Sequence, residues 1–258
     1  MNMNMKTRER LVLFLMLMGF VATGANATVV TTNGCADAAA CQLSELLNGG
    51  SFQIDDLLFH NFSDFTSNVT GGATPVDTTN MTFVSHDTFG GLGPADEIGW
   101  AIREVNSDYQ LSSDQTKDFS FSYDVTTSGA LITDNTLLIS NDTLSDNGGY
   151  LEVTENAFDA SIAGAIIQIA DKLVYDNSEL GTRVDTDHVD YLAGLDTVHV
   201  VTQVTMNGGP VDTDSLLGAQ LFGVVETFSQ ATVPEPATLA LLGVGLVGIG
   251  YSRRRRAN

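Results

Sequence analysis

The chain has 258 residues, of which 43% are hydrophobic and 17% are charged, and its formal net charge at pH 7 is −21. This negative balance excludes nucleic acid and anionic lipid headgroups as expected partners, because both would be repelled. A disordered polyanion is also excluded, since 13 phenylalanines and 6 tyrosines supply enough apolar area for a folded core.

The first 27 residues have the pattern of a secretory signal peptide. Basic residues precede an apolar run, Leu11 to Val21, that is too short to span a bilayer. Ala25 and Ala27 then form a small-x-small cleavage site. We therefore expect export through the Sec machinery, cleavage of this segment rather than its retention as an anchor, and a mature chain that starts at Thr28.

Two cysteines and a short helix are expected at the start of the mature chain. Cys35 and Cys41 are close in sequence, and in an exported protein this spacing predicts a disulfide that closes a small loop. A metal site would need further ligands, and no histidine or other cysteine is near them in the sequence. Residues 42–47 read as one helix, which Asn48 and the two glycines after it end.

The remainder of the body carries the signals of many short strands. The segment Asp96–Val105 is ambiguous, because Ile98 and Ile102 fit a helical face with Val105 but also alternate with Trp100 as a strand would. Together the signals predict an all-β protein, a single jelly-roll-like β-sandwich over residues 28–228 with one short N-terminal helix. The strand candidates are Phe52–Phe59, Met81–Val84, Phe119–Val125, Leu131–Ser140, Leu151–Thr154, Ile162–Ile169, Lys172–Tyr175, Val198–Met206 and Val224–Ala231.

The delivered body is more acidic than the whole chain. Seven of the 11 basic residues lie in the signal peptide and at the C-terminus, whereas only Glu9 and Glu235 of the 32 acids lie outside the body. The segment from Thr28 to Thr232 therefore holds 30 acidic and 4 basic residues, a net charge of about −26. We interpret this excess as a solvated acidic surface in preference to a dedicated cation site.

Catalytic and metal-binding motifs are absent from the sequence. There is no nucleophile elbow, P-loop or dinucleotide fingerprint, so no enzyme activity and no cofactor are predicted. The densest polar cluster lies in residues 185–190 and has neither the spacing of a calcium loop nor that of a zinc-binding helix. We therefore favour an acidic turn over a metal loop there. The weak metal candidates of this cluster are Asp185, Asp187, His188 and Asp190.

The other histidines are expected to have structural roles. His199 alternates with two valines, so it is predicted to face solvent from a strand. His60 and His86 adjoin phenylalanine-containing segments and are expected to pack or cap.

The last 30 residues, 229–258, combine a stalk with a three-part signal. A Pro-Glu-Pro triplet precedes an uncharged run over residues 237–251, which with its flanks approaches the length of a membrane helix, although a buried core helix is the alternative. A basic cluster follows and would stay in the cytoplasm, which favours the membrane helix. The triplet is Pro234, Glu235 and Pro236, and the cluster is Arg253, Arg254, Arg255 and Arg256.

This tail resembles the PEP-CTERM sorting signal of Gram-negative bacteria. The resemblance implies that an exosortase recognises the triplet, that the arginines fix the orientation in the membrane, and that the protein passes through an inner-membrane-anchored intermediate to the cell surface or extracellular matrix. The segments Leu43–Phe62 and Val225–Gln230 also resemble one group of PEP-CTERM proteins, which implies an exported β-rich protein in bacteria that make exopolysaccharide.

The sequence is compatible with three functions. We favour a non-enzymatic surface or matrix protein that is associated with exopolysaccharide or biofilm. The second hypothesis is a carbohydrate-binding β-sandwich that uses Trp100 and tyrosines, with or without the assistance of Ca²⁺. The third is a secreted hydrolase whose carboxylates meet only in space.

Overall fold

The computed structural model of the chain describes residues 30–86, 97–104, 110–140, 143–144, 148–161, 167–210, 218–221 and 223–231. The predicted signal peptide and its cleavage site, the Pro-Glu-Pro triplet, the apolar run and the arginine cluster all lie outside these residues. In the described part of the chain, no helix has the length and apolar character that a bilayer crossing requires.

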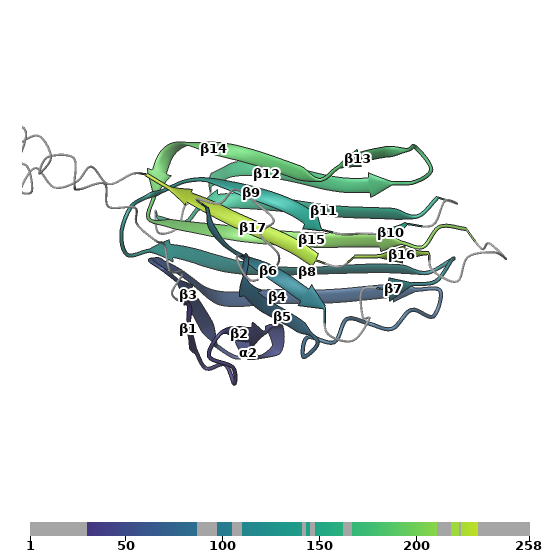
Figure 1. Ribbon diagram of the computed structural model, residues 1–258, viewed down its shortest axis with the longest axis horizontal. Helices are drawn as coiled ribbons and strands as arrows, with labels where there is room; N and C mark the ends of the chain where they lie inside the picture. The colour runs from purple at the N-terminus through teal and green to yellow at the C-terminus, as the bar shows by residue number, and fades with distance from the viewer. Residues whose placement is uncertain are drawn as a thin grey trace, which may run out of the picture.

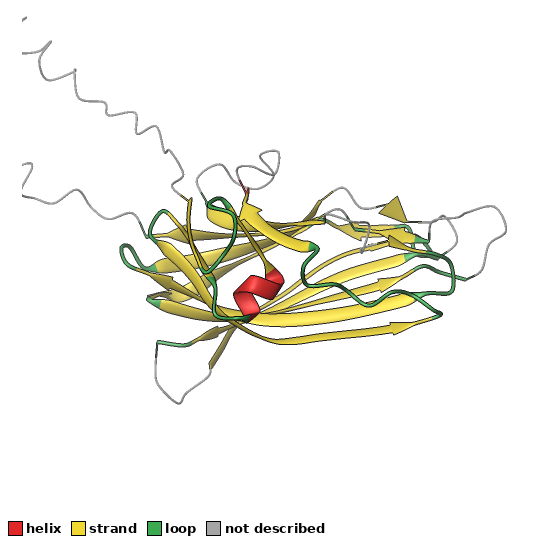
Figure 2. Ribbon diagram, turned by 90° about the horizontal axis from the view of Figure 1, so that it is seen from below, coloured by secondary structure: helices red, strands yellow, loops and turns green. Residues whose placement is uncertain are grey.

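Two antiparallel sheets stacked face to face form the body of the protein (Figure 1, Figure 2). In the described residues the larger sheet has eight strands and the smaller has six. Across the larger sheet the strands are β1 (Val30–Asn33), β3 (Ser51–Ile54), β4 (Leu57–Thr70), β8 (Thr116–Thr127), β15 (Thr197–Asn207), β11 (Tyr150–Asp159), β12 (Ile167–Asn177) and β13 (Thr182–Val184). Across the smaller sheet they are β14 (Thr186–Leu195), β9 (Ile132–Ser140), β17 (Gly223–Gln230), β6 (Ile98–Glu104), β5 (Met81–Ser85) and β2 (Ala40–Gln42).

Two small elements complete the described fold. The helix α2 (Leu43–Leu47) packs against β4 and β5, and its capping box is formed by Gln42 and Glu45. A further sheet joins three two-residue strands at one end of the sandwich (Figure 1). These strands are β10 (Thr143–Leu144), β16 (Ala219–Gln220) and β7 (Gln110–Leu111).

The mostly-β sandwich that the sequence predicts is therefore confirmed. The ambiguous segment around Trp100 is a strand, β6, and the helix after the second cysteine is present as α2. The candidates Ile162–Ile169 and Lys172–Tyr175 both overlap the continuous strand β12, although residues 162–166 lie outside the described part. β17 continues to Gln230, so the first two residues assigned to the stalk are paired in the sheet.

Aromatic rings from both sheets meet in the core. Trp100 on β6 is fully buried, and its ring centroid lies 4.9 Å from that of Phe83 and 5.7 Å from that of Tyr123 on the opposite sheet. Phe59 and Phe228 join the two sheets in the same way, 5.9 Å apart. Because Trp100 is a core residue, it offers no surface platform for a sugar, contrary to the part it has in the carbohydrate-binding hypothesis.

The long strand β4 has two irregularities in its pairing with β8. Asn61 and Asp64 adopt positive φ values of 55°, and the register to β8 shifts on either side of Ser63. Asparagine and aspartate tolerate this conformation better than most residues. The first irregularity lets Phe59 and Phe62, three residues apart, both point into the core.

Candidate functional site

The acidic cluster that the sequence singled out forms a strand rather than a turn. β14 starts at Thr186, so successive side chains alternate between the faces of the six-stranded sheet. Asp185 pairs with Arg183, and Asp187 accepts a hydrogen bond from the Leu173 amide at 2.9 Å. Asp190 Oδ1 lies 3.3 Å from His188 Nε2, but Asp185 and Asp187 make their contacts elsewhere, so the four candidates do not converge on one point. Of the four, His188 joins a potential metal site.

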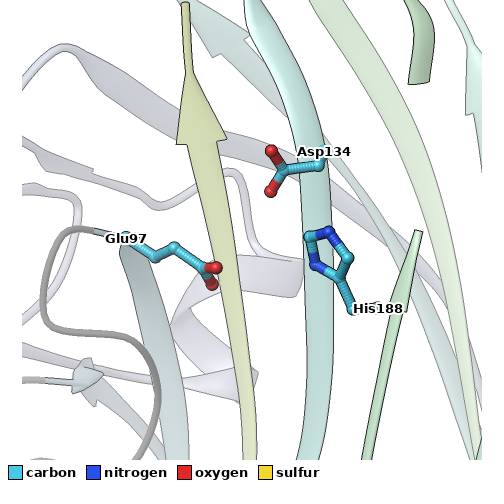
Figure 3. A group of neighbouring side chains, drawn as sticks. All are labelled: Glu97, Asp134 and His188. Atoms are coloured by element: carbon cyan, nitrogen blue, oxygen red, sulfur yellow. The ribbon is translucent and has the colours of Figure 1, made fainter. Parts of the chain in front are cut away.

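That site is a group of three side chains that are distant in sequence. One ligand atom each from Glu97, Asp134 and His188 lies within 4.8 Å of the others. Figure 3 shows Glu97 and His188 extending toward each other from opposite sides, with Asp134 above them on β9. Glu97 and Asp134 are each 8% exposed, while the His188 side chain is 44% exposed, so the group is open to solvent on one side.

Strand register explains how these residues meet. On β9 the odd-numbered Asn135 points into the core, so Asp134 and Thr136 face outward. His188 of β14 is paired with Thr136, and Thr227 of β17 is paired with Thr136 from the other side. The outer face of the six-stranded sheet thus carries a row of polar side chains across three neighbouring strands, and Glu97 reaches this row from the residue before β6.

Two threonines hold the group in place. The Thr136 hydroxyl lies 2.9 Å from His188 Nδ1 and donates to Glu97 Oε1 at 3.3 Å. The Thr227 hydroxyl donates to the second oxygen of Glu97. One oxygen of Asp134, Oδ2, accepts from Thr133, whereas Oδ1 is buried and has no hydrogen-bond partner. Two carboxylates and an imidazole in this arrangement are the donor set of a divalent transition-metal site.

Sequence reasoning missed Glu97 and Asp134. Neither lies in a recognisable motif, and 32 acidic residues give any one of them a low prior as a ligand. The only available signal was the polarity of Asp134 in the otherwise strand-like segment from Leu131 to Ser140.

A second polar cluster lies inside the sandwich, between the sheets. Glu155 on β11 and Lys172 on β12 are directly opposite one another, both are 0% exposed, and Lys172 Nζ lies 2.5 Å from Glu155 Oε1. Asn135 donates to Glu155 Oε1 at 2.6 Å and to Glu226 Oε1 at 3.1 Å, and Tyr123 donates to the other oxygen of Glu226. Asn135 therefore links the Glu155–Lys172 ion pair to the carboxyl group of Glu226.

Glu226 is the neutral member of this cluster. Burial raises its pKa well above the ordinary value, and the Glu155 charge raises it further, whereas Lys172 acts in the opposite direction. Burial likewise raises the pKa of Tyr191, and the charge of Glu155 adds to this effect. A protonated Glu226 leaves Glu155 and Lys172 as a balanced buried pair.

The remaining histidines have the structural roles that were expected, with one refinement. His60 hydrogen-bonds Thr126 at 2.9 Å, and His86 is 3% exposed. His199 faces outward as predicted but is only 27% exposed, because its Nδ1 lies 2.7 Å from Asp124. Burial raises the pKa of Asp124, but bonds and charges from His199 and its neighbours outweigh burial and lower that pKa overall.

Cys35 and Cys41 form the predicted disulfide.

A polar pocket of about 340 Å³ lies at one end of the eight-stranded sheet, and no aromatic ring is among its described lining residues. These residues are Thr70, Asp114, Thr116, Gly148, Glu179, Asn207, Gly209 and Pro210.

The C-terminal segment identifies the class of protein as one that carries a sorting signal for export. Residues 232–256 match the PEP-CTERM protein-sorting motif, and this range includes the Pro-Glu-Pro triplet and the four arginines. The chain therefore carries a PEP-CTERM sorting motif, and this motif implies export, an exosortase as processing partner and a membrane-anchored intermediate before processing.

Comparisons of the whole chain add no functional assignment. No curated protein matches it. Among solved structures it is similar to TmCBM61 in complex with β-1,4-galactotriose (9% identity, 65% of this chain and 86% of that chain, TM-score 0.24). It is also similar to the family 32 carbohydrate-binding module from C. perfringens NanJ in complex with galactose (12%, 64% and 93%, TM-score 0.23) and to a chitosan-binding module from Paenibacillus sp. IK-5 (11%, 62% and 92%, TM-score 0.23). Because these TM-scores are low, the sugars bound by those modules indicate nothing about a ligand of this chain.

Proposed function

We propose that this chain is a non-enzymatic protein of the bacterial cell surface or extracellular matrix, which functions within an exopolysaccharide or biofilm matrix. The observation that carries the proposal is the sorting motif at residues 232–256, which follows directly on a folded β-sandwich. The predicted signal peptide at the other end supports the same route of export.

The chemistry of the body supports a structural role in a hydrated polymer. Its net charge of about −26 keeps the protein soluble and repels other polyanions. The two core carboxyl groups, Glu155 and Glu226, are 0% exposed, so a substrate has no access to them in this structure. This burial favours a role in the core over an acid–base pair for hydrolysis.

The route of export is tested by replacing Pro234, Glu235 and Pro236 together with alanine. We expect the variant to accumulate at its unprocessed size in the membrane fraction, while the natural chain reaches the extracellular fraction. Pro75→Ala, which changes an exposed proline far from the motif, is the control and should behave as the natural chain. Release of the triple variant at normal size and amount would refute sorting through the motif.

The matrix role needs a separate measurement. In a strain that lacks this chain, we expect less protein-bound polysaccharide in the extracellular fraction and a weaker biofilm. The triple variant should not restore either property. A biofilm of unchanged mass and composition in the deletion strain would refute the matrix role while leaving the export route intact.

A second candidate function is direct binding of a polysaccharide in the polar pocket. The pocket offers the carboxylates of Asp114 and Glu179 beside threonine hydroxyls, and such groups can hydrogen-bond sugar hydroxyls. A glycan array with and without Ca²⁺ tests this function. Binding that falls in Asp114→Asn and Glu179→Gln but not in the exposed control Asp171→Asn would support it, and an array without any binding would refute it.

A further inference from the structure

The group formed by Glu97, Asp134 and His188 has a feature that an ordinary acidic surface lacks. Asp134 is 8% exposed, and its Oδ1 atom is buried with no hydrogen-bond partner. A buried carboxylate oxygen without a partner destabilises the folded chain, because its hydrogen bonds to water are lost and no hydrogen bond within the protein replaces them. The same carboxylate lies beside Glu97, so two negative groups are close together in a poorly solvated place. A bound cation would satisfy both.

We propose that Glu97, Asp134 and His188 bind one divalent transition-metal ion, of which Zn²⁺ is the representative, on the outer face of the six-stranded sheet. This site is independent of the sorting motif and of the proposed matrix role.

The donor set selects the class of ion. An imidazole nitrogen beside two carboxylates suits zinc and its first-row neighbours, whereas calcium and magnesium prefer oxygen ligands alone. With bonds of about 2.1 Å, tetrahedral ligands are roughly 3.4 Å apart. The three donor atoms span up to 4.8 Å, so small side-chain rotations bring them to the required spacing.

Neighbouring groups orient the histidine as a ligand requires. His188 Nδ1 contacts the Thr136 hydroxyl at 2.9 Å, and Nε2 lies 3.3 Å from Asp190 Oδ1. Both ring nitrogens therefore have an oxygen partner, so a metal ion would replace one of these contacts while the other fixes the tautomer and the orientation of the ring. Because the His188 side chain is 44% exposed, the fourth position of the metal would face solvent.

Binding would connect β6 to the neighbouring pair β14 and β9, from which β17 separates it. His188 lies on β14, Asp134 on β9 and Glu97 at the start of β6, with β17 between the last two. An ion held by all three strengthens the sheet across four strands. An ion that binds only the folded chain at 100 times its Kd should raise Tm by roughly 5–10 °C.

The test uses the untagged full chain, purified in a mild detergent, treated with chelator and dialysed. Zn²⁺ binding is measured by titration calorimetry, first alone and then in the presence of millimolar Ca²⁺. We expect one Zn²⁺ per chain with a Kd in the micromolar range or tighter, unaffected by Ca²⁺. Cys35 and Cys41 do not compete for the ion, because they are joined as a disulfide.

Nearly isosteric variants locate the site. Asp134→Asn and His188→Gln should each weaken Zn²⁺ binding at least tenfold and remove the rise in Tm, while Asp185→Asn, an exposed carboxylate outside the group, should change neither. Co²⁺ provides a readout independent of folding, since its visible absorption should appear with the natural chain and change in His188→Gln. Binding that Ca²⁺ abolishes, that persists in Asp134→Asn and His188→Gln, or that is absent would overturn the proposal.

Discussion

Replacing Glu155 with glutamine would leave Lys172 as an unpaired charge inside the sandwich. Both side chains are 0% exposed, and no water reaches them. Breaking a buried ion pair by removing one partner costs about 3–5 kcal/mol. For a domain of 150–250 residues, each kcal/mol shifts Tm by about 2–4 °C, so Glu155→Gln should lower Tm by roughly 6–20 °C.

Glu226→Gln is the matched perturbation with the opposite expectation. The raised pKa of Glu226 means that the folded chain holds a neutral carboxyl there, which glutamine imitates in size and charge. As the pH rises above the ordinary carboxyl pKa, the unfolded chain releases a proton that folded Glu226 retains, so the natural chain loses stability. Relative to the natural chain, Glu226→Gln should therefore gain stability with rising pH, by at most about 1.4 kcal/mol per pH unit, up to the folded pKa.

Thermal unfolding followed by circular dichroism, at several pH values between 4 and 8, measures both variants under the same conditions. The double variant Glu155→Gln/Lys172→Met removes both charges and should recover much of the loss seen in Glu155→Gln, because no lone charge remains buried. Equal Tm values for Glu155→Gln and Glu226→Gln at pH 7, or a Glu226→Gln advantage that does not change with pH, would refute this account of the core.

Three smaller perturbations test other parts of the fold by denaturant unfolding. Changing Cys35 and Cys41 to serine removes a short loop closure and should cost about 2 kcal/mol, and a loss close to zero would mean that the unfolded chain is not constrained there. Gly99→Ala would place a Cβ atom 1.9 Å from a backbone oxygen of β17, so we expect a loss of at least 3 kcal/mol, on the order of other severe overpacking, and an unchanged Tm would contradict the close strand contact. Asp124→Asn should cost about 1 kcal/mol at pH 7, where the lowered pKa keeps Asp124 ionised beside His199, and progressively less as the pH falls below the ordinary carboxyl pKa toward the lowered one, so a loss independent of pH would contradict the pairing.

The strands that the sequence predicted best are those with one clear alternating pattern. Residues 119–125 and 198–206 lie within β8 and β15, which pair along their full length in the larger sheet. Even and odd positions differ in polarity throughout residues 119–125, and in residues 198–206 apart from Val201 and Thr202, which is the information that a period of two requires. The disulfide could be predicted for a different reason, because two nearby cysteines in an exported chain have few alternatives.

β14 was interpreted as a turn because its charges hide the alternation. It is an edge strand of the six-stranded sheet, and acidic side chains on an exposed edge are a common protection against further strand pairing. In the middle of this strand, Tyr191 is the one residue whose side chain is buried. A pattern with so few buried positions resembles a polar loop in sequence.

The interior charges could not be predicted at all. On β12 the usual order is reversed, since Lys172 points inward with no exposure while Leu173 is 39% exposed. Glu226 lies in a segment where both faces are buried, so alternation does not show which side chains enter the core. Such placements depend on the partner across the sandwich, and a single strand contains no information about that partner.

The two polar clusters lie back to back on the same strands, and this arrangement constrains the register of the smaller sheet. On β9, Asn135 reaches the buried carboxyls while Asp134 faces the proposed metal site, and on β17 the same division separates Glu226 from Thr227. A slip of one residue on either strand would exchange the two faces, because the side-chain period is two. It would take Asn135 or Glu226 out of the buried cluster and place apolar side chains in the metal site. The polar core therefore contributes to specificity even where it adds little net stability, because only the correct pairing lets Asn135 bridge Glu155 and Glu226.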